Sequence, residues 1–139
     1  MSFVLDASAI LRYLEDEAGA ARVTEILEEC LEGKSRALVS SVQWGEVACF
    51  AHKRRGAQFV EAILAALLTL GIEVVPATQQ RAVRSGIIKA TKNIPYADCF
   101  AVELAGDSPD HLLITADFDF KPAEKDVRIE FLPANPRPS

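Results

Sequence analysis

The chain has 139 residues, half of them hydrophobic, which suits one domain with a substantial core and leaves little room for a second. Its three cysteines form no CxxC pair, which favours buried, reduced thiols over a disulfide framework. The longest apolar run, residues 62–70, is too short to cross a membrane. A formal net charge of −5 argues against a protein whose whole surface is basic enough to bind nucleic acid.

The first half of the chain alternates short apolar runs with helical patterns. Strands are expected at 3–5 and 37–39, and helices at 7–14, 18–31 and 41–55. Asp6 directly follows the first strand. Ser40 or Ser41 is suited to cap the third helix, and Gly56 is suited to end it.

The second half continues the alternation. Helices are expected at 58–70, 78–92 and 95–105, and strands at 72–75, 112–114 and 127–132. Pro95 occupies the favoured first turn of its helix. The helix at 58–70 is apolar around most of its circumference, so it is either deeply buried or exposes one side as an interface.

These elements predict the fold class. Strands of three to five continuously apolar residues are typical of a parallel sheet covered on both faces. Their alternation with helices indicates a three-layer α/β/α sandwich with a short, mostly parallel sheet of four or five strands. We expect one domain over 1–133 and a tail at 134–139. No signal peptide is apparent before the first strand, so we expect a cytoplasmic protein.

Four acidic residues fall where such a fold gathers functional groups, beyond the carboxyl ends of the strands. Asp6 and Asp117 follow two apolar strands, and Glu46 and Asp98 lie in the first turns of two helices. Viewed singly, each has an ordinary interpretation as a helix cap, a turn residue or a solvated group. Together they predict one acidic pocket.

Such a pocket needs a cation. Two carboxylates about 4 Å apart repel by roughly 4 kcal/mol at an effective dielectric near 20. Four would stay partly protonated or would destabilise the fold unless a divalent ion balanced them. All-oxygen ligands favour Mg²⁺ or Mn²⁺, and the absence of a His/Cys ligand set disfavours zinc.

The sequence resembles PIN-domain proteins, and in particular VapC-type toxins of toxin–antitoxin pairs. Four blocks carry the resemblance: residues 3–11 (FVLDASAIL), 40–47 (SSVQWGEV), 96–101 (YADCFA) and 113–120 (LITADFDF). They span most of the chain in the family's order. The third block departs from the commoner Asp-Ala opening, because Cys99 follows Asp98.

The resemblance implies a Mg²⁺- or Mn²⁺-dependent endoribonuclease that acts on RNA, forms a homodimer and is inhibited by a small antitoxin protein. It assigns catalysis and metal binding to Asp6, Glu46, Asp98 and Asp117. It assigns supporting roles to Ser8, Thr115 and Asp119. Basic side chains near these helices are candidates for RNA contact, although they would equally solvate a surface: Lys53, Arg54, Arg55, Lys89 and Lys92.

Other readings of the acids are possible. A haloacid dehalogenase-type phosphatase also has a strand that ends in Asp, but it needs a second Asp where this chain has Ser8. A phosphorelay receiver needs an acceptor Asp after a middle strand, and the strand at 37–39 leads only to serines. A PIN-like nuclease of RNA processing without an antitoxin, or a non-catalytic PIN scaffold that binds RNA or protein, stays an alternative.

Overall fold

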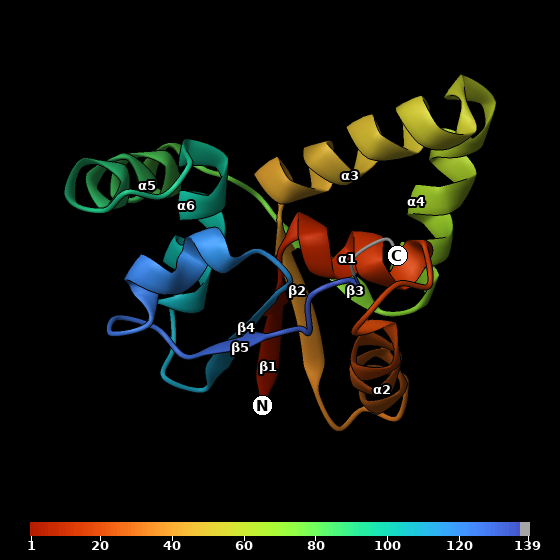
Figure 1. Cartoon of the computed structure of the whole chain (residues 1–139), viewed down its shortest axis with the longest axis horizontal. Coiled ribbons are helices and arrows are strands. Elements are labelled where there is room, and N and C mark those ends of the chain that lie inside the picture. The colour runs from red at the N-terminus through yellow and green to blue at the C-terminus, as the bar shows by residue number, and fades with distance from the viewer. Residues whose placement is uncertain (137–139) are drawn as a thin grey trace.

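The computed structural model describes residues 1–136, and a five-stranded sheet forms its centre (Figure 1). The strands lie in the order β3-β2-β1-β4-β5, and each neighbouring pair is parallel. Their bounds are β1 Ser2–Leu5, β2 Arg36–Ser40, β3 Ile72–Val75, β4 His111–Thr115 and β5 Ile129–Phe131. The predicted parallel sheet is confirmed, with five strands.

Helices fill the connections between the strands. They are α1 Ala7–Leu14, α2 Ala20–Leu31, α3 Ser41–Arg55, α4 Val60–Thr69, α5 Gln79–Thr91 and α6 Tyr96–Ala105. Two short 3₁₀-helices accompany them, η1 Ala57–Phe59 and η2 Phe118–Ala123. The expected helices begin and end within two residues of these bounds. The short helix η2 was not expected from the sequence; it begins three residues after the end of β4.

The helices cover both faces of the sheet, so the three-layer sandwich is confirmed. On one face α1 to α4 contribute core residues, among them Ile10, Val47 and Leu67. On the other face the core includes Leu104 of α6 and Phe120 of η2. Figure 1 shows α5 and α6 on the opposite side of the sheet from α2 and α4. The continuously apolar sequences of the strands are consistent with this arrangement, because both faces of the sheet are buried.

The start of each helix follows from local chemistry. The side chains of Asp6, Ser40 and Thr78 cap α1, α3 and α5 by accepting hydrogen bonds from backbone N–H groups of the first turn. Since α1 and α3 begin directly after β1 and β2, their N-termini lie at the carboxyl edge of the sheet (Figure 1). The strand order reverses direction between β1 and β4, which is where α/β sheets open a crevice.

One helix keeps much of its apolar surface exposed. Within α4, Leu67 is the fully buried residue, whereas Leu68 and the preceding Phe59 are about half exposed, at 48% and 51%. Of the two possibilities for this helix, an exposed apolar side is therefore the correct one.

Three further expectations, on the cysteines, a membrane span and the C-terminal tail, can be compared with the structure. The cysteines are free as expected, but only Cys99 is buried; Cys30 is half-buried and Cys49 is exposed on α3. No helix within residues 1–136 is long and apolar enough to span a bilayer. The expected tail begins at residue 134, and its last three residues, 137–139, lie outside the described part.

Candidate active site

Asp6 is enclosed at the end of β1. The residue is only 2% exposed, and its carboxylate accepts hydrogen bonds from the Ala9 backbone N–H at 2.9 Å, from Ser8 Oγ at 2.7 Å and from Thr115 Oγ1 at 2.6 Å. Thr115 ends β4, which pairs directly with β1. The adjacency of these two strands therefore joins residues that are far apart in the sequence.

The two hydroxyl groups are oriented by backbone donors. The Ala116 N–H donates to Ser8 Oγ at 2.9 Å, and the Asp117 N–H donates to Thr115 Oγ1 at 3.0 Å. Each hydroxyl has one proton, and each directs it at Asp6. The surroundings of Asp6 thus consist of donors only, which is the arrangement that solvates an ionised carboxylate. Ser8 and Thr115 lie where the supporting role was predicted.

Gln43 connects Asp98 to this cage. Its side chain is 1% exposed, and its Oε1 accepts from the Ala7 N–H at 2.6 Å. Its Nε2 donates to the Ala97 carbonyl at 2.9 Å and to Asp98 Oδ1 at 3.2 Å. One amide therefore holds together the first turns of α1, α3 and α6.

The sequence analysis missed Gln43. A signal was available, because Gln43 lies three residues before Glu46 in the same helix, and that spacing places both side chains on one face. The pattern of carboxylates in the sequence does not by itself point to an uncharged amide.

Asp117 and Asp119 follow β4. The Asp119 N–H donates to Asp117 Oδ1 at 2.9 Å, so Asp117 caps η2. Asp117 is half-buried and Asp119 is exposed. The role of a turn residue, which was one interpretation of Asp117, is therefore present in the structure together with its place beside the other acids.

The acids influence one another electrostatically. Burial raises the pKa of Asp6 to about 7, against the lowering effect of its three donors, and the charge of Asp98 adds to the rise. Burial also raises the pKa of Asp98, opposed by the Gln43 amide and reinforced by the charges of Asp117 and Asp119. Partial burial and the Asp98 charge raise the pKa of Glu46, which lies exposed at the rim. Asp98 is thus the acid whose electrostatic interactions link it with each of the others.

The donor set suits a hard cation, but its members stand apart. Within residues 1–136, no three Asp, Glu, His or Cys side chains lie close enough together to hold one ion directly. Mg²⁺ commonly keeps several waters and takes only one or two carboxylates as direct ligands, so a spaced set of carboxylates is compatible with it. Among residues 1–136 these four acids form no ion pair with a basic side chain, and the pKa values of Asp6, Glu46 and Asp98 are raised.

The five basic residues proposed for RNA contact lie in three different settings. Arg54 and Arg55 end α3 and pair with Glu15 at 3.6 Å and 3.4 Å, and Lys92 pairs with Asp126 at 2.5 Å. The end of α3 is roughly 13 Å of helix from Glu46. Lys53 and Lys89 are exposed and make no ion pair among residues 1–136. The structure therefore does not gather these five residues around the acids.

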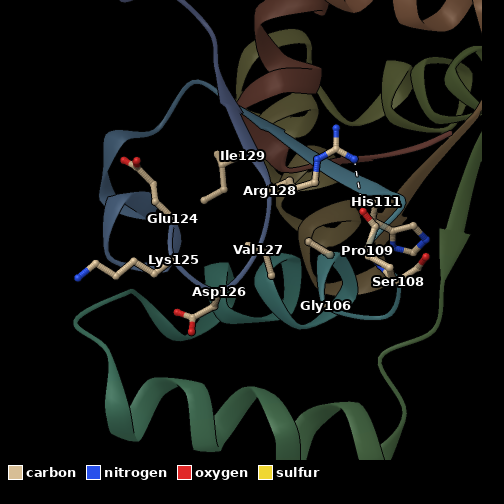
Figure 2. A pocket seen from close by; sticks show the side chains of 11 residues that line it. Gly106, Ser108, Pro109, His111, Glu124, Lys125, Asp126, Val127, Arg128 and Ile129 are labelled. Carbon is tan, nitrogen blue, oxygen red and sulfur yellow. Dashed lines mark hydrogen bonds between the residues drawn. The ribbon is translucent and has the colours of Figure 1, made fainter.

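One cavity lies away from the acids. It has a volume of about 520 Å³ and lies by the amino ends of β4 and β5, where its lining includes His111 and Ile129. Figure 2 shows Arg128 of this cavity donating to the Pro109 carbonyl. The acids occupy the opposite, carboxyl edge of the sheet.

The fold and the site together define a class: a parallel α/β/α sandwich with carboxylates from four segments at the switch point of the sheet. A family model described as PIN domain matches residues 3–126. The chain belongs to the PIN-domain family, as the sequence motifs indicated. A search of curated proteins found no match.

Solved structures of similar fold are VapBC proteins. Chains in DNA-bound VapBC from Salmonella typhimurium and in VapBC2 from Rickettsia felis bound to a promoter fragment are 22% and 13% identical, with TM-scores of 0.69 and 0.70. These alignments cover 94% and 96% of this chain and 98% and 100% of those chains. VapC20 from Mycobacterium tuberculosis, a toxin that cleaves the sarcin–ricin loop, is 13% identical with a TM-score of 0.65 over 94% of this chain and 99% of its own. The family model confirms the PIN domain, and the likeness to VapC-type proteins is confirmed for the fold.

Proposed function

We propose that the protein is a Mg²⁺- or Mn²⁺-dependent endoribonuclease and the toxin of a type II toxin–antitoxin pair. The observation that supports the proposal is the enclosure of Asp6 by hydrogen-bond donors, together with the electrostatic influence that links Asp98 with Asp6, Glu46 and Asp117. Asp6 caps α1, but it is buried without a cationic partner among residues 1–136, which is the setting in which a bound cation would stabilise it.

The four carboxylates would hold the ion, partly through water, and Asp119 could add a further ligand. Bound Mg²⁺ or Mn²⁺ supplies positive charge that polarises the scissile phosphate and lowers the pKa of a bound water. Ser8, Thr115 and Gln43 keep the carboxylates oriented, which spares the site a reorganisation when substrate binds.

Glu46 is the best placed of the acids to receive a proton. It lies exposed at the rim, and its raised pKa makes it a better base than an unperturbed glutamate. In the proposed reaction Glu46 orients the attacking water and takes its proton. Because water rather than the ribose 2′-hydroxyl attacks, the products are a 5′-phosphate and a 3′-hydroxyl. Products that end in a 2′,3′-cyclic phosphate would contradict this step.

The proposed substrate is RNA, in accordance with the activity stated for VapC20. Lys53 and Lys89 are free of ion pairs among residues 1–136 and can contact phosphates directly. Arg54, Arg55 and Lys92 would first have to leave their acidic partners.

The proposed partners are an antitoxin and a second copy of the chain. The similar structures from Salmonella typhimurium and Rickettsia felis are VapBC proteins, as their names state. The apolar side of α4, with Phe59 and Leu68 half exposed, is surface that a protein partner would cover. A toxin that acts on RNA and is bound by an antitoxin would be located in the cytoplasm. We propose that residues 1–133 form its single nuclease domain.

The decisive experiment is cleavage of a structured RNA by the purified chain with Mg²⁺, Mn²⁺ or EDTA. We expect cleavage with either ion and none in EDTA. Asp6→Asn and Asp98→Asn should each lower the rate by at least a hundredfold. The matched control is Asp16→Asn, because Asp16 is exposed in a left-handed conformation (φ 51°) that asparagine also adopts. The proposal would be refuted if the wild-type protein still cleaved RNA in EDTA, or if both variants cleaved RNA at the wild-type rate.

The two alternatives make different forecasts. A non-catalytic PIN scaffold would bind RNA or protein but leave RNA intact in this assay. An RNA-processing nuclease without an antitoxin would cleave RNA, and its gene would have no small neighbouring frame for a DNA-binding protein. Growth arrest on expression that is relieved by such a neighbour would favour the toxin.

A further inference from the structure

An exposed aromatic ring lies directly beside the acids. Phe118 is 45% exposed and follows Asp117 in the chain. Its ring stacks on that of Phe131, with centroids 5.3 Å apart and planes inclined by 14°. Phe131 itself is half-buried against the core. Phe118 is therefore held flat on a firm support and keeps a large part of its surface in solvent.

Packing does not require this ring. Phe120, two residues later in η2, is fully buried in the core and supplies the apolar anchor of this short helix. An exposed phenylalanine beside a buried one costs hydration without adding to the core. A ligand with an apolar face is the natural counterpart for Phe118.

The sheet register places the ring close to the carboxylates. Phe131 pairs with Thr115 across the β4–β5 ladder, where neighbouring strands lie about 4.8 Å apart. Thr115 is the residue that donates to Asp6. The Phe118–Phe131 stack therefore lies one strand beyond the hydroxyl that touches the buried acid.

A cation accompanies the ring. Lys121 Nζ is 5.6 Å from the centroid of Phe118, because residues three apart in a 3₁₀-helix lie on the same face. Lys121 is exposed and makes no ion pair within residues 1–136, whereas Lys92, Arg54 and Arg55 are occupied by acids. Its ammonium group is thus available to a phosphate.

We propose that Phe118 and Lys121 form a nucleobase subsite next to the cleavage centre. An unpaired base of the RNA stacks on the Phe118 ring in place of the Lys121 ammonium, which moves to the adjoining phosphate. Base–aromatic stacking tolerates any base and needs a single-stranded nucleotide, so the subsite selects loops, bulges or ends over continuous duplex. This inference rests on the proposed nuclease function for the identity of its ligand.

The steady-state test compares cleavage of an unstructured RNA by Phe118→Leu, Phe118→Trp and Leu31→Ala. Loss of one stacked base weakens binding by roughly five- to a hundredfold. We expect Phe118→Leu to raise KM within that range with kcat within about twofold, and Phe118→Trp to restore KM. Leu31→Ala is the control, since Leu31 is an exposed apolar residue at the end of α2 and has no part in the proposed site. Unchanged KM in Phe118→Leu overturns the subsite and leaves the proposed function standing.

A second measurement does not depend on cleavage. Trp44 is the only tryptophan, so Trp44→Phe combined with Phe118→Trp puts a single fluorophore at the subsite. Single-stranded oligouridine or oligoadenosine in EDTA should quench its emission, and an RNA duplex of the same length should not. Equal quenching by the duplex, or none by either strand, contradicts the subsite. If wild type cleaves no RNA and single strands still quench, the nuclease proposal fails while the subsite survives.

Lys121 is tested through salt dependence. Removing one phosphate contact lowers the slope of log Kd against log salt by about one. We expect that change for Lys121→Gln, and none for Lys34→Gln, whose lysine pairs with Glu32. An identical slope for wild type and Lys121→Gln removes the phosphate contact. Emission from the tryptophan at position 118 that responds to an antitoxin peptide but not to RNA would show a protein contact in its place.

Discussion

At the scale of single residues, Gln43 is the amide on which three helix starts depend. It accepts from the Ala7 N–H and donates to Ala97 and Asp98, all from a fully buried position. A buried backbone N–H that loses its acceptor costs about 1–3 kcal/mol. Gln43 therefore links the stability of the fold to the orientation of an acid that the proposed reaction uses.

We expect Gln43→Leu to lower the free energy of unfolding by about 1–3 kcal/mol, because the Ala7 N–H is left unpaired. The pKa of Asp98 should rise further, because the amide that lowers it is gone. Gln43→Glu should retain the bond from Ala7 but lose both donated bonds, so it should impair cleavage more than it impairs folding. Urea unfolding and RNA cleavage measure the two effects.

Gln80→Leu on the exposed face of α5 serves as the control and should change neither quantity. If Gln43→Leu is as stable as Gln80→Leu, the hydrogen bond to Ala7 contributes nothing. Asp6 and Asp98 could be nominated from the sequence because an acid after an apolar strand is a local pattern. Gln43 could not be nominated in this way, because its hydrogen bonds depend on how α1, α3 and α6 pack together.

At the scale of elements, ion pairs help to attach α5 to α6. Its one fully buried residue is Ser85, whose hydroxyl has no hydrogen-bond partner within residues 1–136, and Val83 and Ile87 are exposed. Arg81 and Arg84 instead donate to Glu103 of α6, each at 2.9 Å. Glu103 is 6% exposed, so this contact is largely shielded from water.

We expect Glu103→Gln to destabilise the protein by about 1–2 kcal/mol. Breaking a buried ion pair can cost 3–5 kcal/mol, but Arg81 keeps Asp107 at 2.6 Å and Arg84 is half exposed to water. Because Glu103 receives both arginines of α5, the amides of α5 should exchange with solvent faster in this variant while those of β1 and β4 stay protected. Hydrogen exchange resolves the two regions.

Glu28→Gln, an exposed change on α2, should leave both regions as in wild type. Uniform loss of protection across the sheet in Glu103→Gln would show that α5 unfolds only with the whole molecule. The bounds of α5 were predictable from its capping threonine and its apolar spacing. Its mode of attachment was not, because the pairing of Arg81 and Arg84 with Glu103 depends on how α5 packs against α6.

At the scale of the whole molecule, the buried acid couples folding to pH. In the metal-free protein the pKa of Asp6 is about 7 against 3.8 in the unfolded chain. Between these values the folded protein holds a proton that the unfolded chain releases, so stability falls as pH rises. The stability contributed by neutral Asp6 is complete below about pH 3.8 and is lost as the pH passes about 7.

We expect Asp6→Asn in EDTA to gain stability relative to wild type by about 2–3 kcal/mol between pH 5 and pH 8, since one pKa unit corresponds to about 1.4 kcal/mol. At pH 8, Mg²⁺ or Mn²⁺ at a hundred times its Kd should stabilise wild type by about 2.7 kcal/mol and should hardly affect Asp6→Asn. Thermal melting at both pH values, with and without metal, measures this.

Asp16→Asn again provides the control and should follow wild type throughout. A constant difference between Asp6→Asn and wild type from pH 5 to pH 8 would contradict the raised pKa of Asp6. An equal response of both proteins to metal would place the ion elsewhere.

The sequence alone determined the order of elements, the parallel α/β class and the placing of acids after strands and in first turns. These depend on local periodicity and capping, which a short segment carries by itself. Only the tertiary structure decided that β1 lies beside β4, so that Thr115 reaches Asp6, and that Arg54 and Arg55 are occupied by Glu15. Parallel strands pair across long stretches of chain, and the partner of each side chain is then set by packing, which periodicity does not record.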